Sequence, residues 1–187
     1  NVVDATMRTY REAMKGLLPT PSKSHYTFNL RDFSRVVQGV LLQAPSGEFA
    51  NKSSVMRLWT HEALRVFGDR LTDDNDRKWM CAHAATMCKE IFRCDFQSEF
   101  EHIRPADETE TGYGTLRRLF WGDYMTPADE DDRPYVEVRD LQLLQNRTED
   151  SLAEFNQTSK KPMELVMFMF AIEHVSRIAR VLRMPGG

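Results

Sequence analysis

Arg31 is the residue of this chain whose position most suggests binding chemistry. It falls in the first turn of a predicted helix that Asn29 would begin as N-cap, with Asp32 placed to complete a capping box. Unpaired N–H groups and the helix dipole already make that turn positive, so a further cation there is unfavourable unless an anion offsets it. Backbone donors and a planar guanidinium converge well on phosphate oxygens, which predicts that Arg31 binds phosphate. The alternative is a local ion pair of Arg31 with Asp32, Glu12 or another nearby carboxylate.

A second group of charged residues lies on the predicted helix 54–71. Residues 57–67 run Arg-Leu-Trp-Thr-His-Glu-Ala-Leu-Arg-Val-Phe. The apolar residues of the helix form a stripe typical of a core, made of Met56, Trp59, Ala63, Phe67 and Leu71. Arg65 and Arg70 are candidates for contact with a neighbouring unit of a larger assembly. The alternative is that both are solvated charges on the helix surface.

The cysteines could in principle form a metal site with His83. Cys81, Cys88 and Cys94 show no C-x-x-C spacing, however, and Cys94 would point away from the other two on a helix. We therefore expect no metal site, and small buried thiols in a reducing compartment instead.

Motifs of known catalytic sites are absent from the sequence. It contains no G-x-x-x-x-G-K-[ST] loop, no H-E-x-x-H and no G-x-S-x-G, and its five histidines are scattered. We expect the chain to be inert on its own.

Lys and Arg total 25 and Asp and Glu 28, without long blocks of either sign, which argues against binding to nucleic acid or an acidic membrane. The longest apolar run, 163–172, is well below the roughly 20 residues of a membrane span.

Helical spacing of the apolar residues predicts an all-α fold. In the first helix, about residues 2–18, the expected stripe is Val3, Met7, Tyr10, Met14 and Leu17. The last helix should be apolar on most of its circumference, through Leu165, Val166 and Phe168, and so either buried all round or docked on a partner. The helices are predicted at about 2–18, from Asn29 up to the break at 44–47, and at about 54–71, 74–93, 140–156 and 161–184. Four helices thus form a bundle over residues 1–94, an irregular connector follows over 95–139, and two further helices occupy 140–187.

The stretch 25–39, H-Y-T-F-N-L-R-D-F-S-R-V-V-Q-G, resembles the small subdomain of the third AAA+ unit of dynein heavy chains, most closely the axonemal ones. Residues 58–71 are similar to the W-x-H-E-x-x-R-x-F-x-D-R-L helix of that family. Residues 120–125, F-W-G-D-Y-M, resemble its F-G-D-Y-M turn with Trp121 as an extra residue, and residues 163–187 resemble the helix that leads into the fourth unit.

The resemblance implies an AAA+ lid-type four-helix bundle, a connector and the first helices of the next AAA+ unit. In such lids the second helix carries a sensor-II arginine that reaches the nucleotide, and Arg31 occupies that place. The implied ligands are ATP or ADP with Mg in the parent protein, with none held by this fragment alone because the Walker A and B motifs are missing. The sequence following Gly187 is expected to resume with a strand and a phosphate loop.

The implied function is to sense nucleotide in the third unit and to transmit lid closure around the ring, in support of minus-end-directed movement along microtubules in cilia. Its implied partners are the rest of the heavy-chain ring, microtubules, and dynein intermediate and light chains; its implied location is the cytoplasm and cytoskeleton, in the axoneme of the cilium. No nucleic acid or membrane partner is expected. The competing hypothesis is a stand-alone helical interaction module without catalytic activity, which would require exposed apolar patches.

Overall fold

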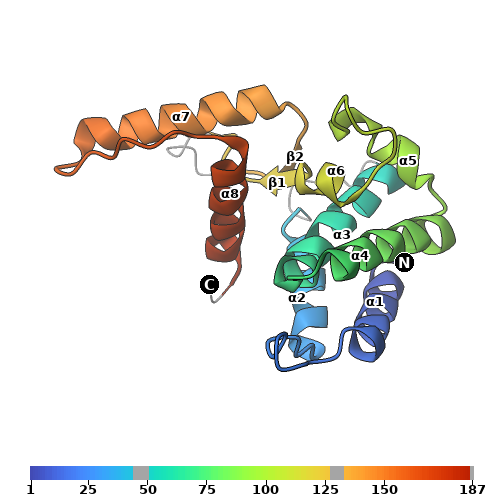
Figure 1. The fold of residues 1–187 in the computed structure, drawn as a ribbon. Coiled ribbons are helices and arrows are strands. Elements are labelled where there is room, and N and C mark those ends of the chain that lie inside the picture. The colour runs from blue at the N-terminus through green and yellow to red at the C-terminus, as the bar shows by residue number, and fades with distance from the viewer. Residues whose placement is uncertain (44–50, 127–132, 186–187) are drawn as a thin grey trace. The chain divides into compact units, whose positions relative to one another are not determined.

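The structure is a computed structural model that describes residues 1–43, 51–126 and 133–185. It divides into two compact units, Asn1–Arg117 and Arg118–Gly187. The predicted all-α class is confirmed, since the described residues hold eight α-helices and a single two-stranded sheet. The first unit contains α1 (Val2–Gly16), α2 (Leu30–Leu41), α3 (Lys52–Val66), α4 (Asp74–Met87), α5 (Phe96–Glu99) and α6 (Tyr113–Arg117), and the second contains β1 (Phe120–Gly122), β2 (Val136–Val138), α7 (Leu141–Thr158) and α8 (Met169–Arg183), as labelled in Figure 1.

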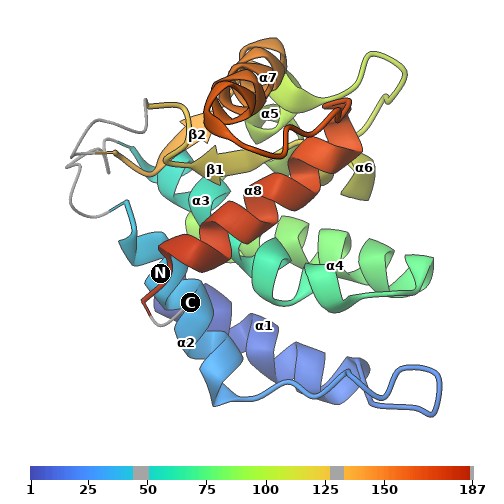
Figure 2. The same cartoon turned by 90° about the vertical axis from the view of Figure 1, so that its left-hand side faces the viewer.

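Helix α3 is the central element of the first unit and contacts both α1 and α2. Its predicted core stripe is confirmed, because Met56, Trp59, Ala63, Phe67 and Leu71 are all buried. The helix ends at Val66, and a short 3-10 turn, η2 (Gly68–Arg70), continues the chain to Leu71. A loop over residues 17–29 joins α1 to α2 (Figure 2).

The face that α1 buries is not the one we predicted. Ala5, Thr6, Thr9 and Ala13 are buried, whereas Val3 is 56% and Met14 48% exposed. Small side chains let helix backbones approach closely, and the Thr6 hydroxyl is satisfied there because it donates to Val2 O and accepts from Trp59 Nε1 of α3. Of the predicted stripe, Leu17 is buried, and Met7 and Tyr10 are partly buried.

The fourth helix changes from α-helical to π-helical geometry before its predicted end at Arg93. The α-helical part stops at Met87, and a π-helical turn, η3 (Cys88–Phe92), follows it. Arg93 then adopts the left-handed conformation, with φ 53°, and its N–H bonds to Cys88 O. This geometry closes the helix end as a glycine would in many proteins.

The connector is less irregular than predicted. Besides α5 and α6 it holds a 3-10 turn, η4 (Glu101–Ile103), and the antiparallel pair β1 and β2, in which Trp121 lies opposite Glu137. Three-residue strands are too short for a two-residue alternation to stand out in the sequence. The boundary between the two compact units falls inside this stretch.

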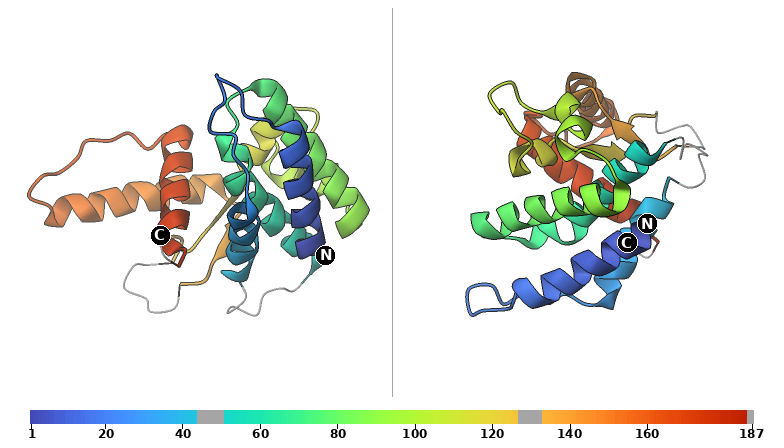
Figure 3. Two further views of the ribbon diagram at one scale, coloured as in Figure 1. Left: turned by 90° about the horizontal axis from the view of Figure 1, so that it is seen from below. Right: turned by 90° about the vertical axis from the view of Figure 1, so that its right-hand side faces the viewer.

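In the second unit, Phe120, Val138, Leu144 and Ile172 form a small apolar core. The last helix begins at Met169 rather than near Lys161, because residues 161–168 are not helical in the structure. The segment between the two helices is extended and turns back along α7 before α8 starts (Figures 1 and 3).

Helix α8 is not buried all round in the structure. It buries Ile172, Glu173, Ser176 and Arg180. Its opposite surface exposes apolar side chains, and so does the segment before it; the exposed residues are Leu165, Val166, Phe168, Phe170, Val175, Ile178, Val181 and Leu182. Within the described part of the chain, no helix is long and apolar enough to cross a membrane.

Candidate functional site

The N-terminus of α2 is built as the sequence predicts. Asn29 Oδ1 accepts a hydrogen bond from the Arg31 N–H at 2.8 Å, and the Asn29 N–H donates to Asp32 Oδ2 at 2.9 Å. The capping box is therefore complete, and it fixes the backbone of the first turn. The Asp32 side chain is only 1% exposed.

Arg31 stands on this turn with an exposed side chain. Neither carboxylate that we considered as a local partner is used by Arg31, because Asp32 pairs with Arg70, and Glu12 pairs with Lys15 at 2.9 Å. Among residues 1–43, 51–126 and 133–185, the guanidinium of Arg31 makes no hydrogen bond or ion pair. Its five donors can therefore meet a ligand from outside the described chain.

Arg70 reaches the same turn from η2, the segment after α3. Its guanidinium pairs with both Asp32 oxygens, with Nη1 3.3 Å from Oδ2. Nη1 also donates to Thr27 O at 3.2 Å, and the group lies 5.5 Å from the centre of the Phe28 ring. A residue 38 positions away thus holds the start of α2.

The loop that precedes α2 is tied to the start of α4 by further polar contacts. The Tyr26 hydroxyl donates to Asp76 at 2.9 Å and accepts from the Thr72 N–H at 3.0 Å. Lys23 pairs with the same Asp76 carboxylate, and the His25 ring bonds to Arg70 O at 2.8 Å. Arg31 is accordingly presented from an anchored segment.

Arg65 and Arg70 both have partners inside the first unit. The Arg65 side chain is 5% exposed and lies 3.3 Å from Asp69, one turn further along the chain. Solvated charge on the helix surface therefore describes neither residue well. Contact of either arginine with a neighbouring unit stays a prediction.

Helix α3 carries buried charges that were not predicted from the sequence. Arg57 pairs with Glu99 of α5 at 2.8 Å, with only 8% and 15% of the two side chains exposed, and Ser53 donates to the same carboxylate at 2.6 Å. Glu62 is fully buried, and its Oε1 lies 3.0 Å from His61 Nδ1. Helical spacing could not predict these pairs. Arg57 and Glu99 lie on different helices, and the adjacent polar residues His61 and Glu62 would be expected on a solvent-exposed face.

The cysteines and His83 occupy different surroundings. Cys81 and Cys88 are buried, which raises the pKa of the Cys81 thiol to about 11 and that of Cys88 to about 12. His83 Nε2 lies 3.0 Å from the Thr9 hydroxyl, and burial lowers the pKa of the imidazole. In the described ranges, no three His, Cys, Asp or Glu side chains gather as a possible metal site.

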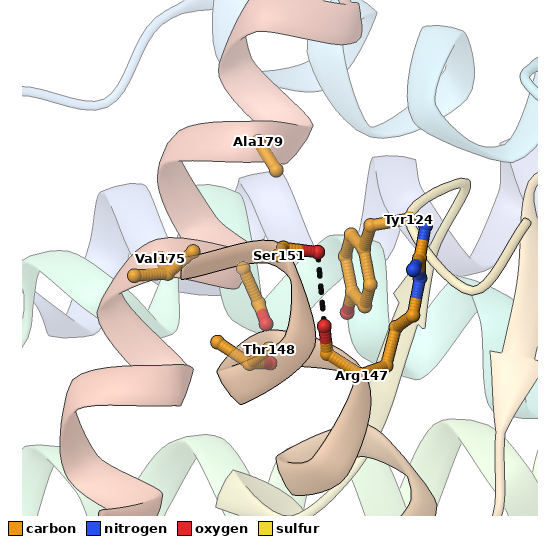
Figure 4. A pocket seen from close by; sticks show the side chains of 7 residues that line it. Tyr124, Arg147, Thr148, Ser151, Val175 and Ala179 are labelled. Atoms are coloured by element: carbon orange, nitrogen blue, oxygen red, sulfur yellow. Dashed lines mark hydrogen bonds between the residues drawn. The ribbon is translucent and has the colours of Figure 1, made fainter. Parts of the chain in front are cut away.

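The second unit contains a small cavity between α7 and α8, which Figure 4 shows from close by. Thr148 and Ser151 on its wall donate to main-chain oxygens one turn earlier in α7, at 2.8 and 2.9 Å. Arg147 lies 3.6 Å from Glu154. The volume of about 170 Å³ is below the roughly 300 Å³ at which ligand pockets begin, so this cavity does not suit a nucleotide.

Comparison with known proteins gives relatives along the whole chain. Residues 1–77 match the family model described as dynein heavy chain, ATPase lid domain. All 187 residues are 46% identical to dynein axonemal heavy chain 12 of Homo sapiens, of which the chain covers 6%. The identity is 46% to dynein axonemal heavy chain 3 and 36% to dynein axonemal heavy chain 6 of Homo sapiens, with 4% of each covered.

The family match covers most of the helices that position the candidate site. The matched residues 1–77 include α1, α2, α3 and the start of α4, and therefore the whole of the α2 terminus with Arg31, Asp32 and Arg70. The chain spans only a small part of the relatives that it matches. The chain belongs to the dynein heavy chains of the axonemal type, as a segment that contains their ATPase lid domain.

Proposed function

We propose that this segment is the lid of the third AAA+ unit of an axonemal dynein heavy chain, and that Arg31 senses the nucleotide bound in that unit. In this proposal residues 1–94 are the lid, 95–139 the connector and 140–187 the first helices of the fourth unit. The parent heavy chain would supply ATP or ADP with Mg, and the phosphate-binding loop that the segment lacks.

The observation that carries the proposal is the free guanidinium of Arg31. It stands exposed on the first turn of a twelve-residue helix, where the helix dipole favours an anion, and it has no partner among the described residues. A surface arginine next to a buried carboxylate would ordinarily pair with it. Because Arg70 takes Asp32, Arg31 stays available for terminal phosphate oxygens.

Sensing follows from a difference in contact between lid positions. A guanidinium carried on the lid can bind terminal phosphates only when the lid approaches them, so ATP and ADP would favour different lid angles. The lid would then move as a rigid body and pass its displacement to the next unit of the ring. In the parent protein this would support minus-end-directed movement along microtubules in the ciliary axoneme, together with intermediate and light chains.

The test is Arg31→Ala in the full heavy chain. The measured quantity is the coupling ratio, defined as the microtubule release rate with ATP in the third unit divided by the rate with ADP there. Loss of a charge-assisted contact worth ~1.5 kcal/mol predicts a coupling ratio reduced about tenfold. Arg35→Ala is the matched control, since Arg35 is an exposed arginine one turn further along α2. An unchanged ratio in a correctly folded Arg31→Ala protein would rule out the sensor role.

The stand-alone interaction module deserves a test of its own because the structure does expose apolar side chains, on α1 and around α8. The relatives are far longer than this chain. A segment of such a long protein would also expose apolar surfaces when the rest of the parent protein is absent. The coding sequence after residue 187 decides between the two hypotheses. A strand followed by a glycine-rich phosphate loop supports the lid, whereas a stop codon supports the module.

A further inference from the structure

We infer that Arg70 is a positioning residue for Arg31 and acts on it through Asp32. The inference rests on the proposed function, because positioning Arg31 matters only if Arg31 meets a phosphate. It adds a second arginine, from a distant part of the chain, to the residues on which nucleotide sensing depends.

The side chains of Arg70 and Asp32, together with Asn29, form a continuous series of contacts that ends at the backbone N–H of Arg31. Arg70 pairs with both oxygens of Asp32, and Asp32 Oδ2 accepts from the Asn29 N–H at 2.9 Å. The Asn29 side chain in turn accepts from the Arg31 N–H at 2.8 Å. Displacement of the Asp32 carboxylate would therefore disturb the residue that holds the backbone of Arg31.

Asp32 needs Arg70 to keep its place. Its side chain is 1% exposed, and a carboxylate so far removed from water is unfavourable unless it is paired and hydrogen-bonded. Arg35 is the other described cation near it, at 3.9 Å, but the Arg35 side chain is 58% exposed. Arg70 is therefore the partner that compensates the buried charge.

Arg70 is itself fixed at several points. The side chain donates to Thr27 O and lies over the Phe28 ring, and its carbonyl oxygen bonds to the His25 ring. Its planar fork holds two oxygens at once, which an ammonium group cannot reproduce. The pair thus connects η2 to the first turn of α2 in a single defined geometry.

Such support lowers the cost of ligand binding by Arg31. A binding group gains affinity when its backbone is already held in the bound arrangement, because less freedom is lost on binding. The Arg31 side chain is exposed to solvent, while its backbone N–H is bonded to the Asn29 side chain of the capping box. Loss of Arg70 should weaken sensing even though Arg70 makes no contact with the nucleotide.

The experiment compares single and double variants in the full heavy chain, with the coupling ratio as readout and circular dichroism as a check of folding. We expect Arg70→Gln to reduce the ratio about fivefold, and Arg70→Lys to reduce it less, because charge is kept while the fork is lost. Arg35→Gln is the control and should leave the ratio unchanged. In an Arg31→Ala background, Arg70→Gln should add less than about a twofold reduction, since the residue that it positions is already absent.

The variants distinguish failure of the positioning role of Arg70 from failure of the sensor role of Arg31. If Arg70→Gln reduces the ratio as strongly in the Arg31→Ala background as alone, Arg70 acts by another route and the inference is wrong. The same holds if Arg31→Ala reduces the ratio and Arg70→Gln does not, although the proposed function then stands. If Arg31→Ala has no effect, the proposed function itself fails. Should Arg70→Gln fail to fold, Arg70→Lys provides the same comparison.

Discussion

Gly39 of α2 lies directly against the carboxylate of Glu62 on α3. A Cβ at position 39 would clash with Glu62 Oε2, and Glu62 is fully buried. The two helices can approach this closely only because position 39 has no side chain. Helix α2, which carries Arg31, thus packs closely against α3 at the contact between Gly39 and the buried Glu62.

Gly39→Ala should therefore destabilise the chain. The added methyl group must displace Glu62 or separate the helices, and overpacking of this kind costs ~1–3 kcal/mol. The free energy of unfolding in urea measures the effect. Gly16→Ala is the control, because the nearest atom to its Cβ is 3.9 Å away and alanine favours the helix. Equal stability of the two variants would contradict the close approach.

The Arg57–Glu99 pair should contribute far more to stability than a surface pair of the same type. Arg57→Met leaves the nearly buried Glu99 without its cation, and breaking a buried pair in this way costs ~3–5 kcal/mol. Arg77→Met removes a pair whose acidic partner, Asp74, is 84% exposed, so less than ~1 kcal/mol is expected. Urea denaturation of both variants compares them. Similar losses would mean that the Arg57 pair is open to water.

His83 should make stability fall as the pH is lowered. Burial lowers its pKa below the ordinary 6.5, so the unfolded chain takes up a proton at a higher pH than the folded chain does. The contribution of neutral His83 is complete above pH 6.5 and is lost as the pH falls through its lowered folded value. His83→Gln, which keeps a donor for the Thr9 hydroxyl, should reduce the loss of unfolding free energy between pH 7.5 and about pH 5.5. The same pH dependence in both proteins would refute this assignment.

The thiols should differ in reactivity. Burial raises the pKa of Cys81 to about 11 and that of Cys88 to about 12, and the thiolate is the reactive form. Cys94 is only partly buried. Alkylation with iodoacetamide at pH 8, followed by mass spectrometry of the peptides, should modify Cys94 first and the other two only in denaturant. Rapid alkylation of Cys81 or Cys88 in the folded protein would contradict their burial.

Local patterns in the sequence were sufficient for the features that depend on neighbouring residues. Asn29 and Asp32 lie within one helical turn, so their types alone predicted the capping box that the structure contains. The all-α class and the core stripe of α3 followed from spacing in the same way. The resemblance to dynein heavy chains rested on several motifs in the correct order, and comparison along the whole chain supports it.

Which partner a charge finds, and which face a helix buries, depended on residues far away in the sequence. Asp32 is paired with Arg70, 38 positions on, and this contact leaves Arg31 free. On α1 the small face was buried instead of the large apolar one, because the threonine hydroxyls find partners there and small side chains permit close packing. Capping and periodicity are set within one or two turns of chain, whereas pairing and packing are set by shape and charge across elements, which the tertiary structure alone decides.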